Sequence, residues 1–266
     1  MGGSLGMAIR KKRLAHEVVG WSRKPATLRQ AKASGAVTWG TTDLRKAVAD
    51  ADLVVLATPV DVMLPLGPRI ARSMKPGSIL TDVGSTKEAI VHALERARRR
   101  GVAFVGAHPL AGSERRGIRA VQKNLYDGSL CIVTTTRRTN RAALARVRRF
   151  WAAIADRVIM MDPARHDQLL AEVSHVPHVM AFCLMAATEP KALAIAPRSF
   201  LDGTRVAKSD PALWEAIFLT NRGQITAAMR RFERTWQQLR KHLAWSDRPA
   251  LRRLLRAAKA KRDALD

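Results

Sequence analysis

Short apolar runs alternate with amphipathic segments up to about residue 160 of the chain. Runs typical of strands occupy residues 17–21, 37–39, 53–57, 78–83 and 102–107. Segments with the 3.6-residue periodicity of helices lie between them, at residues 26–34, 43–49, 62–74 and 87–100. Strands that alternate with helices at this spacing predict an α/β domain built on a doubly wound parallel sheet.

The pattern changes at Asp162-Pro163. A strand (129–135), a helix (142–155) and a last strand (157–161) precede this point, and only helical segments follow it, at 165–188, 212–242 and 248–264. We therefore expect two domains, residues 1–162 with the sheet and an all-helical domain over residues 163–266. The long amphipathic helices predict burial against a partner subunit, and hence a homodimer. Residues 189–209 are expected to form a long connection of the kind that often carries function.

Composition permits a sizeable core, because 47% of the 266 residues are hydrophobic. Cys131 and Cys183 both lie in apolar runs and fit neither a disulfide framework nor a metal-ligand spacing, which favours a reducing cytoplasm. The longest apolar runs, such as residues 179–187, are too short to span a bilayer. Glycines precede the first charged residues, which is the wrong order for a secretory signal. We therefore expect a cytoplasmic protein with no membrane partner.

The formal net charge of +25 is unusually high. Clustered Lys and Arg neutralise nucleic-acid phosphates, so a charge of this size raises the possibility of nucleic-acid binding. The basic residues are dispersed, however, and most fall on the polar faces of predicted helices. This dispersal argues against nucleic acid as a partner, whereas so basic a surface would attract anionic substrates and phosphate-bearing cofactors.

The start of the chain carries half of a cofactor-binding signal. A dinucleotide-binding fingerprint reads G-x-G-x-x-G between a first strand and a helix, and only its last part is present here. Ser4 and the main-chain N–H groups of Gly2 and Gly3 would face a pyrophosphate at a helix N-terminus. The next strand ends at Ser22-Arg23 rather than at the acidic residue that binds the ribose of NAD. Because Arg23 can pair with a 2′-phosphate, we expect NADP to be preferred, with NAD possible.

A histidine and a serine follow two of the predicted strands. His108 follows the run at 102–107, and Ser85 follows the run at 78–83 and opens a helix. Ligands bind at the carboxyl ends of strands in open α/β sheets, and imidazole is the side chain best suited to proton transfer near neutral pH. We expect His108 at the rim of a cleft, with Ser85 orienting it. A lone loop histidine usually has no role, and Ser85 is also a reasonable helix N-cap.

The helical half holds two further candidates. His175 and His178 are three residues apart and share one helix face. No Cys or Glu completes a plausible ligand set with them, so we expect no metal. Arg205 lies in the connection at 189–209 and could bind a carboxylate with its planar guanidinium.

Together, in order along the chain, these motifs are similar to one family. DVGSTK (82–87), HPLAGSE (108–114), the pair His166-Asp167 before SHVPH (174–178) and DGTRVAKSDPALW (202–214) resemble the prephenate and arogenate dehydrogenases of tyrosine biosynthesis. The resemblance covers nearly the whole chain. It implies a Rossmann-type domain followed by a helical dimerisation domain. It also implies oxidative decarboxylation of prephenate to 4-hydroxyphenylpyruvate, or of arogenate to tyrosine, with hydride transfer to NAD(P)⁺.

The resemblance also implies roles for individual residues. His108 would accept the proton of the substrate's C4 hydroxyl, and Ser85 would hold His108 close to the nicotinamide. His178 and Arg205 would bind the substrate's carboxylates. Ser113 and Glu114 are implied to line the substrate pocket near His108. His175 is also counted among the substrate-binding candidates, with support of local structure as its alternative role. Thr58 and Pro59 are expected to contact the cofactor together with Ser85, while His166 is expected to support local structure.

Two features depart from the family's pattern. Matching the family's opening to this sequence places Met1 at the last variable position of G-x-G-x-x-G, so we expect the first strand and the first two glycines to be missing. A chain that began at Met1 is expected to fold poorly and to bind cofactor weakly. Residues 196–201 also lack glycines that the family tends to have before Asp202.

Two other functions compete with this one. The first is a two-domain dehydrogenase acting on a β-hydroxyacid, although the catalytic-lysine motif common in such enzymes is not found. The second is a basic, non-catalytic protein that binds nucleic acid, for which salt-sensitive binding would be expected.

Overall fold

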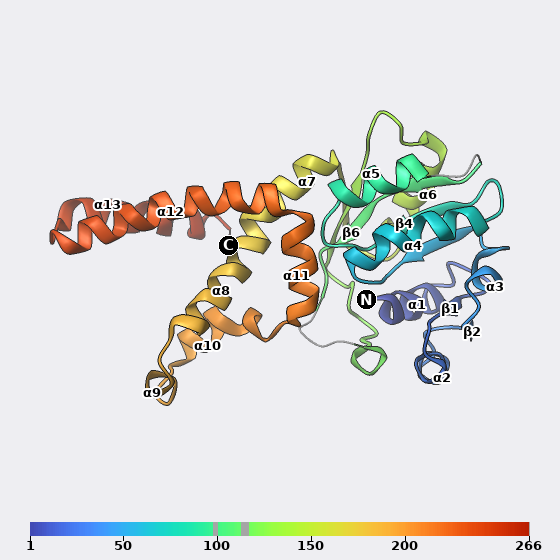
Figure 1. Cartoon of the computed structure of the whole chain (residues 1–266), viewed down its shortest axis with the longest axis horizontal. Helices are drawn as coiled ribbons and strands as arrows, with labels where there is room; N and C mark the ends of the chain where they lie inside the picture. The colour runs from blue at the N-terminus through green and yellow to red at the C-terminus, as the bar shows by residue number, and fades with distance from the viewer. Residues whose placement is uncertain (98–100, 113–116, 266) are drawn as a thin grey trace.

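The computed structural model describes residues 1–97, 101–112 and 117–265. Figure 1 shows a part that contains the sheets and the N-terminus, beside an arm made of helices. The sheet-bearing part comprises α1 (Gly2–Lys11), β1 (Val19–Trp21), α2 (Pro25–Ala33), β2 (Trp39–Thr41), α3 (Leu44–Val48), β3 (Leu53–Leu56), α4 (Val60–Ser73), β4 (Ile79–Asp82), α5 (Glu88–Ala97), β5 (Ala103–Val105), β6 (Ala107–Pro109), the 3₁₀ turn η1 (Ile118–Ala120), β7 (Leu130–Thr134), α6 (Arg141–Ala152) and β8 (Arg157–Met161).

Most strand pairs are parallel, as the alternation of strands and helices predicts. β1 pairs with β2, and β3, β4 and β5 pair in that order, all in parallel. A third sheet has the order β6–β7–β8. The α/β fold class is therefore confirmed, with hydrogen bonding divided among three sheets rather than running through one.

The expected strand at residues 102–107 is wrong in one respect that matters for the site. The strand is interrupted at Gly106, between β5 and β6. β6 pairs antiparallel with β7, with His108 opposite Ile132. A Cβ at Gly106 would lie 2.5 Å from Oγ1 of Thr134, so only glycine allows this close crossing. His108 therefore lies within a paired strand of the third sheet instead of in a loop after a parallel strand.

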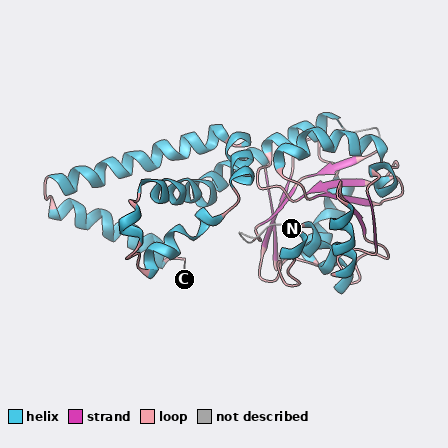
Figure 2. Cartoon of the chain, turned by 60° about the horizontal axis from the view of Figure 1, so that its bottom comes forward, coloured by secondary structure: helices cyan, strands magenta, loops and turns pink. Residues whose placement is uncertain are grey.

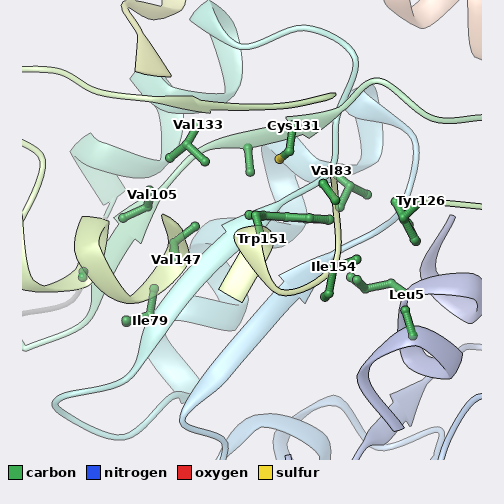
Figure 3. Packing of buried hydrophobic residues seen from close by; sticks show 14 residues of the cluster. Leu5, Ile79, Val83, Val105, Tyr126, Cys131, Val133, Val147, Trp151 and Ile154 are labelled. Atoms are coloured by element: carbon green, nitrogen blue, oxygen red, sulfur yellow. The ribbon is translucent and has the colours of Figure 1, made fainter. Parts of the chain in front are cut away.

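Both faces of the sheet β3–β4–β5 are covered, because neighbouring residues of its strands point to opposite sides. Ile79 packs into a cluster around Trp151 of α6, which also contains Leu5 of α1 (Figure 3). Leu80 packs into a second cluster, with Met63 of α4 and residues of α5. This two-sided covering is the layered arrangement of a doubly wound fold, and Figure 2 shows helices around the magenta strands.

The arm begins where the sequence signal changes. Asp162 caps the first helix by accepting hydrogen bonds from the main-chain N–H groups of Ala164 and Arg165, and Pro163 occupies the first turn. The arm comprises α7 (Pro163–Leu170), the π-helical turn η2 (Ala171–His175), α8 (Val176–Ala187), α9 (Pro190–Leu193), α10 (Arg198–Thr204), the 3₁₀ turn η3 (Arg205–Lys208), α11 (Pro211–Thr220), α12 (Arg222–Ala244) and α13 (Arg248–Asp263). Figure 1 shows α12 and α13 side by side, extending away from the sheets.

Three boundaries in the arm differ from expectation. Residues 189–209 form short helices rather than an irregular connection. The helix expected over 212–242 ends at Thr220, and a new one begins at Arg222, after Asn221. The helix expected over 165–188 contains the π-helical turn, which precedes Pro177 and accommodates a residue that lacks a main-chain N–H.

The first helical stretch of the arm, Pro163–Ala187, is long and apolar enough to cross a membrane by length and composition alone, and 28% of its most apolar window is buried. A single stretch of this kind is weak evidence for a membrane span. Its buried polar residues, His166, Asp167 and His175, bond to other parts of the protein. Its exposed apolar side chains are typical of a helix that packs against a further protein surface.

Candidate active site

His108 lies almost buried where the two parts of the molecule meet, with 9% of its surface exposed. Its Nδ1 is 2.9 Å from Nε2 of His166, which comes from α7 in the arm. The two rings meet edge to face, with centroids 5.1 Å apart. Residues that are far apart in the sequence are thus joined by a hydrogen bond, and the arm fixes the orientation of this imidazole.

The hydrogen-bonded chain continues from His166 to a carboxylate. Nδ1 of His166 lies 2.7 Å from Oδ1 of Asp167. The Asp167 carboxylate also accepts hydrogen bonds from the main-chain N–H groups of Lys87, at 2.7 Å, and Glu88, at 2.9 Å. These groups open α5, where main-chain N–H groups lack partners within the helix and favour a negative charge. Asp167 therefore joins the turn before α5 to the two histidines.

Ser85 lies in that turn and is half-buried. Among the described residues no hydrogen bond joins it to His108, so our expectation that Ser85 holds His108 is corrected: the partner of Nδ1 is His166. The cause is the path of α7, which brings its first turns against α5. Next to Ser85, Oγ1 of Thr86 is 3.1 Å from Oγ1 of Thr220, which forms another contact between the two parts.

A buried ion pair holds the strand of His108. Nζ of Lys87 donates hydrogen bonds to Oδ2 of Asp82 and, at 3.0 Å, to the main-chain oxygen of Ala107. Oδ1 of Asp82 accepts the main-chain N–H of Ala107 at 3.1 Å. Lys87 and Asp82 are both fully buried, so removal of either partner would leave an unpaired buried charge. The pair locks β6 to the end of β4 and so fixes the position of His108.

Burial keeps His108 neutral. It lowers the pKa of His108 well below the usual range, and the nearby His166 and Lys87 act in the same direction. Burial also lowers the pKa of His166, against the opposing influence of Asp167. Within the described parts of the chain, no group hydrogen-bonds Nε2 of His108. The site thus holds a neutral imidazole with one nitrogen engaged and the other available.

The two histidines of the SHVPH motif have different surroundings. Nδ1 of His178 donates to the main-chain oxygen of Ser174 at 2.9 Å, and the ring stacks on Trp214 with centroids 3.5 Å apart. His178 is half-buried, and Nε2 is its other ring nitrogen. Its pKa is lowered by burial.

His175, by contrast, is 1% exposed, and its Nδ1 accepts a hydrogen bond from Nδ2 of Asn221 at 3.1 Å. Burial lowers its pKa to about 4. The expectation that His175 lines the substrate pocket is therefore corrected. A ring enclosed in this way holds the π-helical turn η2 against Asn221, which also donates to the main-chain oxygen of Asp167.

Three substrate-binding candidates remain: Arg205, Ser113 and Glu114. Arg205 is exposed in η3, which packs against α8, the helix of His178. Ser113 and Glu114 lie outside the residues that the structure describes.

The cofactor candidates gather at the start of α1. Gly2 begins this helix, and a Cβ there would lie 2.9 Å from Cβ of Ala57, the residue directly after β3. Gly3 follows it in the same first turn. Thr58 comes directly after Ala57, and its hydroxyl oxygen is buried with no hydrogen-bond partner among the described residues. A glycine that allows close approach, free N–H groups and a hydroxyl without a partner fit the pyrophosphate of a dinucleotide.

Pro59 and Ser4 are the other two cofactor candidates of this region. Pro59 is the N-cap residue of α4, beside Thr58. Ser4 is 1% exposed, and its hydroxyl accepts the main-chain N–H of Gln122 at 3.0 Å. The expectation that the Ser4 side chain faces a cofactor is therefore corrected, because its position in the first turn of α1 directs it into the protein.

Ser22 and Arg23 follow β1. Ser22 is half-buried, and its hydroxyl accepts the main-chain N–H of Lys24 at 3.2 Å. Arg23 is exposed, and no hydrogen bond or ion pair to its side chain occurs among the described residues. Its guanidinium is therefore available to an anionic ligand.

The sequence reasoning missed the residues that organise this site: Asp82, Lys87, Asp167, Trp214 and Asn221. It gave His166 only a structural role. One signal was available, because the pair His166-Asp167 stands at a fixed place in the family's pattern. Their partners across the fold could not be read from local spacing.

Comparison with known proteins agrees with this arrangement. Residues 5–160 match the family described as "Prephenate dehydrogenase, nucleotide-binding domain", and residues 162–257 match "Prephenate dehydrogenase, dimerization domain". The prephenate dehydrogenase of Bacillus subtilis (strain 168) is 29% identical over 277 residues, which cover 100% of this chain and 73% of that protein.

Solved structures agree as well. Prephenate dehydrogenase from Aquifex aeolicus, in complex with hydroxyphenyl propionate and NAD⁺, superposes with a TM-score of 0.91 at 31% identity, covering 100% of this chain and 95% of that one. Synechocystis arogenate dehydrogenase gives a TM-score of 0.84 at 27% identity, covering 100% of this chain and 96% of that one. These matches favour neither a β-hydroxyacid dehydrogenase nor a non-catalytic protein. A Rossmann-type part, a helical arm and a histidine site between them, together with matches to both family domains, mean that this chain belongs to the prephenate dehydrogenase family.

Proposed function

We propose that this protein is an NAD(P)-dependent dehydrogenase that oxidatively decarboxylates prephenate or arogenate, with residues 1–162 binding the dinucleotide and residues 163–266 completing the substrate site. The observation that carries the proposal is the state of His108, a buried neutral imidazole with Nδ1 engaged by His166. An available ring nitrogen of this kind is suited to accept a proton near neutral pH.

The substrate is a cyclohexadienol with a carboxylate on the ring. Nε2 of His108 accepts the proton of the C4 hydroxyl as a hydride leaves C4. The electrons of the bond between the ring and its carboxylate then restore aromaticity as CO₂ departs, and the proton returns from His108 to the phenolate oxygen. A bound nicotinamide dinucleotide supplies the acceptor for the hydride.

Substrate anions call for cationic or hydrogen-bonding groups. A bound carboxylate would favour uptake of a second proton by His178, so that Nε2 could donate to it, and stacking on Trp214 holds the ring in place. Arg205 supplies a guanidinium on the element packed against α8. Ser113 and Glu114 are proposed to line the pocket near His108. Ser85, two residues before Lys87 in the turn that precedes α5, is proposed to face the nicotinamide.

The cofactor is a nicotinamide dinucleotide, and we propose that NADP is preferred. The main-chain N–H groups of Gly2 and Gly3 and the turn at Thr58-Pro59 would hold the pyrophosphate. Arg23 supports the preference, because it is exposed after β1, where a 2′-phosphate would lie.

The exposed apolar side chains of the arm support a homodimer. They include Met180 and Leu184 of α8 and Phe232 and Trp236 of α12. The match of this arm to a dimerization domain points the same way. We also propose a cytoplasmic location, with which the free thiols Cys131 and Cys183 are compatible.

The direct test of this function is turnover. Purified protein is given prephenate or arogenate with NAD⁺ or NADP⁺, and formation of the reduced cofactor is followed by absorbance. We expect turnover with at least one substrate and faster turnover with NADP⁺. Absence of turnover with all four combinations would contradict the proposal.

The cofactor preference has its own prediction. Replacing Arg23 with Ala removes a charge-assisted pair, so the KM for NADP⁺ should rise about tenfold, while the KM for NAD⁺ stays within about twofold. Arg29, an exposed arginine of α2, provides the matched control as Arg29→Ala. An equal effect of Arg23→Ala on both cofactors would count against the 2′-phosphate assignment.

A further inference from the structure

We infer that His166 and Asp167 form a positioning pair that fixes the proton of His108 on Nδ1 and thereby keeps Nε2 free to accept the substrate's proton. This inference rests on the proposed function, because it assigns a task to residues of the same site. It adds two residues of the helical arm to the machinery of the reaction.

The hydrogen-bonded chain has a direction. Ionised Asp167 can only accept, so Nδ1 of His166 must donate to it across 2.7 Å. A neutral His166 then carries no proton on Nε2, so this nitrogen must accept from Nδ1 of His108 across 2.9 Å. A neutral His108 with its proton on Nδ1 has its lone pair on Nε2.

Hydrogen-bond donors surround the Asp167 carboxylate. Its two oxygens accept from the main-chain N–H groups of Lys87 and Glu88, besides His166. Hydrogen bonds to the charged form of a carboxylate favour that form, and the N-terminus of α5 adds its dipole. The ammonium of Lys87 is engaged separately, with Asp82.

Burial, rather than the charges that face the two rings, is the main influence that favours neutral imidazoles. His108 faces His166, Lys87 and His175, and His166 also faces Asp167 and Asp82. Burial lowers the pKa of both rings, so neither holds a second proton near neutral pH.

The opposite tautomer would be inactive as a base. If Nε2 of His166 carried the proton, it would donate the hydrogen bond to Nδ1 of His108. Nδ1 of a neutral His108 would then be unprotonated, and the ring's single proton would be on Nε2. No lone pair would then face the C4 hydroxyl. In serine proteases, an Asn in place of the Asp that orients the catalytic His lowers kcat by about 10⁴ for the same reason.

A spectroscopic measurement tests the inference without any turnover. The full chain is labelled with ¹⁵N-histidine, and the ring nitrogens are observed by NMR near pH 7.5, with His108→Asn and His166→Gln identifying the two signals. We expect His108 to be protonated on Nδ1 and unprotonated on Nε2, and His166 likewise. A proton on Nε2 of His108 in the wild-type protein would overturn the inference.

Enzyme kinetics provide a second test of the inference. His166→Leu removes the acceptor, so kcat should fall about 10²-fold, while KM and the dinucleotide Kd stay within about threefold. The Gln side chain offers an acceptor oxygen, so kcat of His166→Gln should be at least about tenfold higher than kcat of His166→Leu. A merely structural role predicts no such recovery, and equal kcat values for Leu and Gln variants of equal thermal stability would contradict the positioning role.

The two proposals can fail separately. If the wild-type protein turns over neither prephenate nor arogenate, the proposed function fails, whatever the NMR tautomer. If it turns over substrate while His108 carries its proton on Nε2, the function stands and the positioning pair is wrong.

Discussion

Burial and hydrogen bonding give each histidine of the site a distinct state. His108 and His166 form one hydrogen-bonded chain, His175 is enclosed beside Asn221, and His178 is half-buried against Trp214. Burial lowers the pKa of all four rings. A set of neutral imidazoles gives the site acceptors for protons, but it also links the stability of the protein to pH.

The folded protein should lose stability in mild acid. The pKa of His175 is about 4 in the folded state and about 6.5 in an unfolded chain, so its contribution is complete above about pH 6.5 and is lost as the pH falls toward 4. At pH 5 this loss amounts to about 2 kcal/mol. Urea unfolding at pH 7.5 and 5.0 should show a smaller difference for His175→Gln than for the exposed-site control His16→Gln. Identical pH dependence in the two variants would contradict this assignment.

At the scale of elements, local patterns predicted where strands and helices lie but not how they join. The strand at 157–161 was predicted with the bounds that β8 has, because its apolar run is closed by the capping pair Asp162-Pro163. The strand at 102–107 was wrong, because the change of sheet at Gly106 depends on crowding by Thr134. His166 and Asp167 were underestimated for a similar reason, since their partners come from α5 and β6.

The crossing at Gly106 should be sensitive to a single methyl group. Gly106→Ala would press on Thr134 and shift β6, so the free energy of unfolding should fall by about 1–3 kcal/mol, and kcat should fall with it. Gly223 lies in α12 with nothing within 4 Å of an added Cβ, and Gly223→Ala should leave stability unchanged or raise it by up to about 1 kcal/mol. Urea unfolding of both variants checks this, and equal effects would argue against crowding at the crossing.

At the scale of the whole molecule, the division into a sheet-bearing part and a helical arm followed from the change in periodicity at Asp162-Pro163. How the two parts contact each other could not be predicted from this change in periodicity, because it depends on contacts such as His108 with His166 and Thr86 with Thr220. The arm also keeps large apolar side chains exposed. The sequence pattern indicated amphipathic helices there, but it could not show which apolar side chains stay exposed.

The arm should dimerise through these side chains. Trp236 is 55% exposed, and Trp236→Glu would bury a charge in the proposed interface, so the protein should become monomeric or weaken in association by at least about tenfold. Gln238→Glu adds the same charge at an exposed polar position of α12 and provides the control. Sedimentation over a range of concentrations measures both. A wild-type protein that is monomeric throughout would contradict the proposed homodimer.

The central claim, that His108 is the base of the oxidation, is tested most directly by His108→Asn. The variant keeps a polar side chain of similar size and removes the proton acceptor, so kcat should fall by about 10²–10⁴-fold. The dinucleotide Kd, measured by titration calorimetry, should stay within about twofold of the wild-type value. Turnover by His108→Asn at a rate close to that of the wild type would contradict the account.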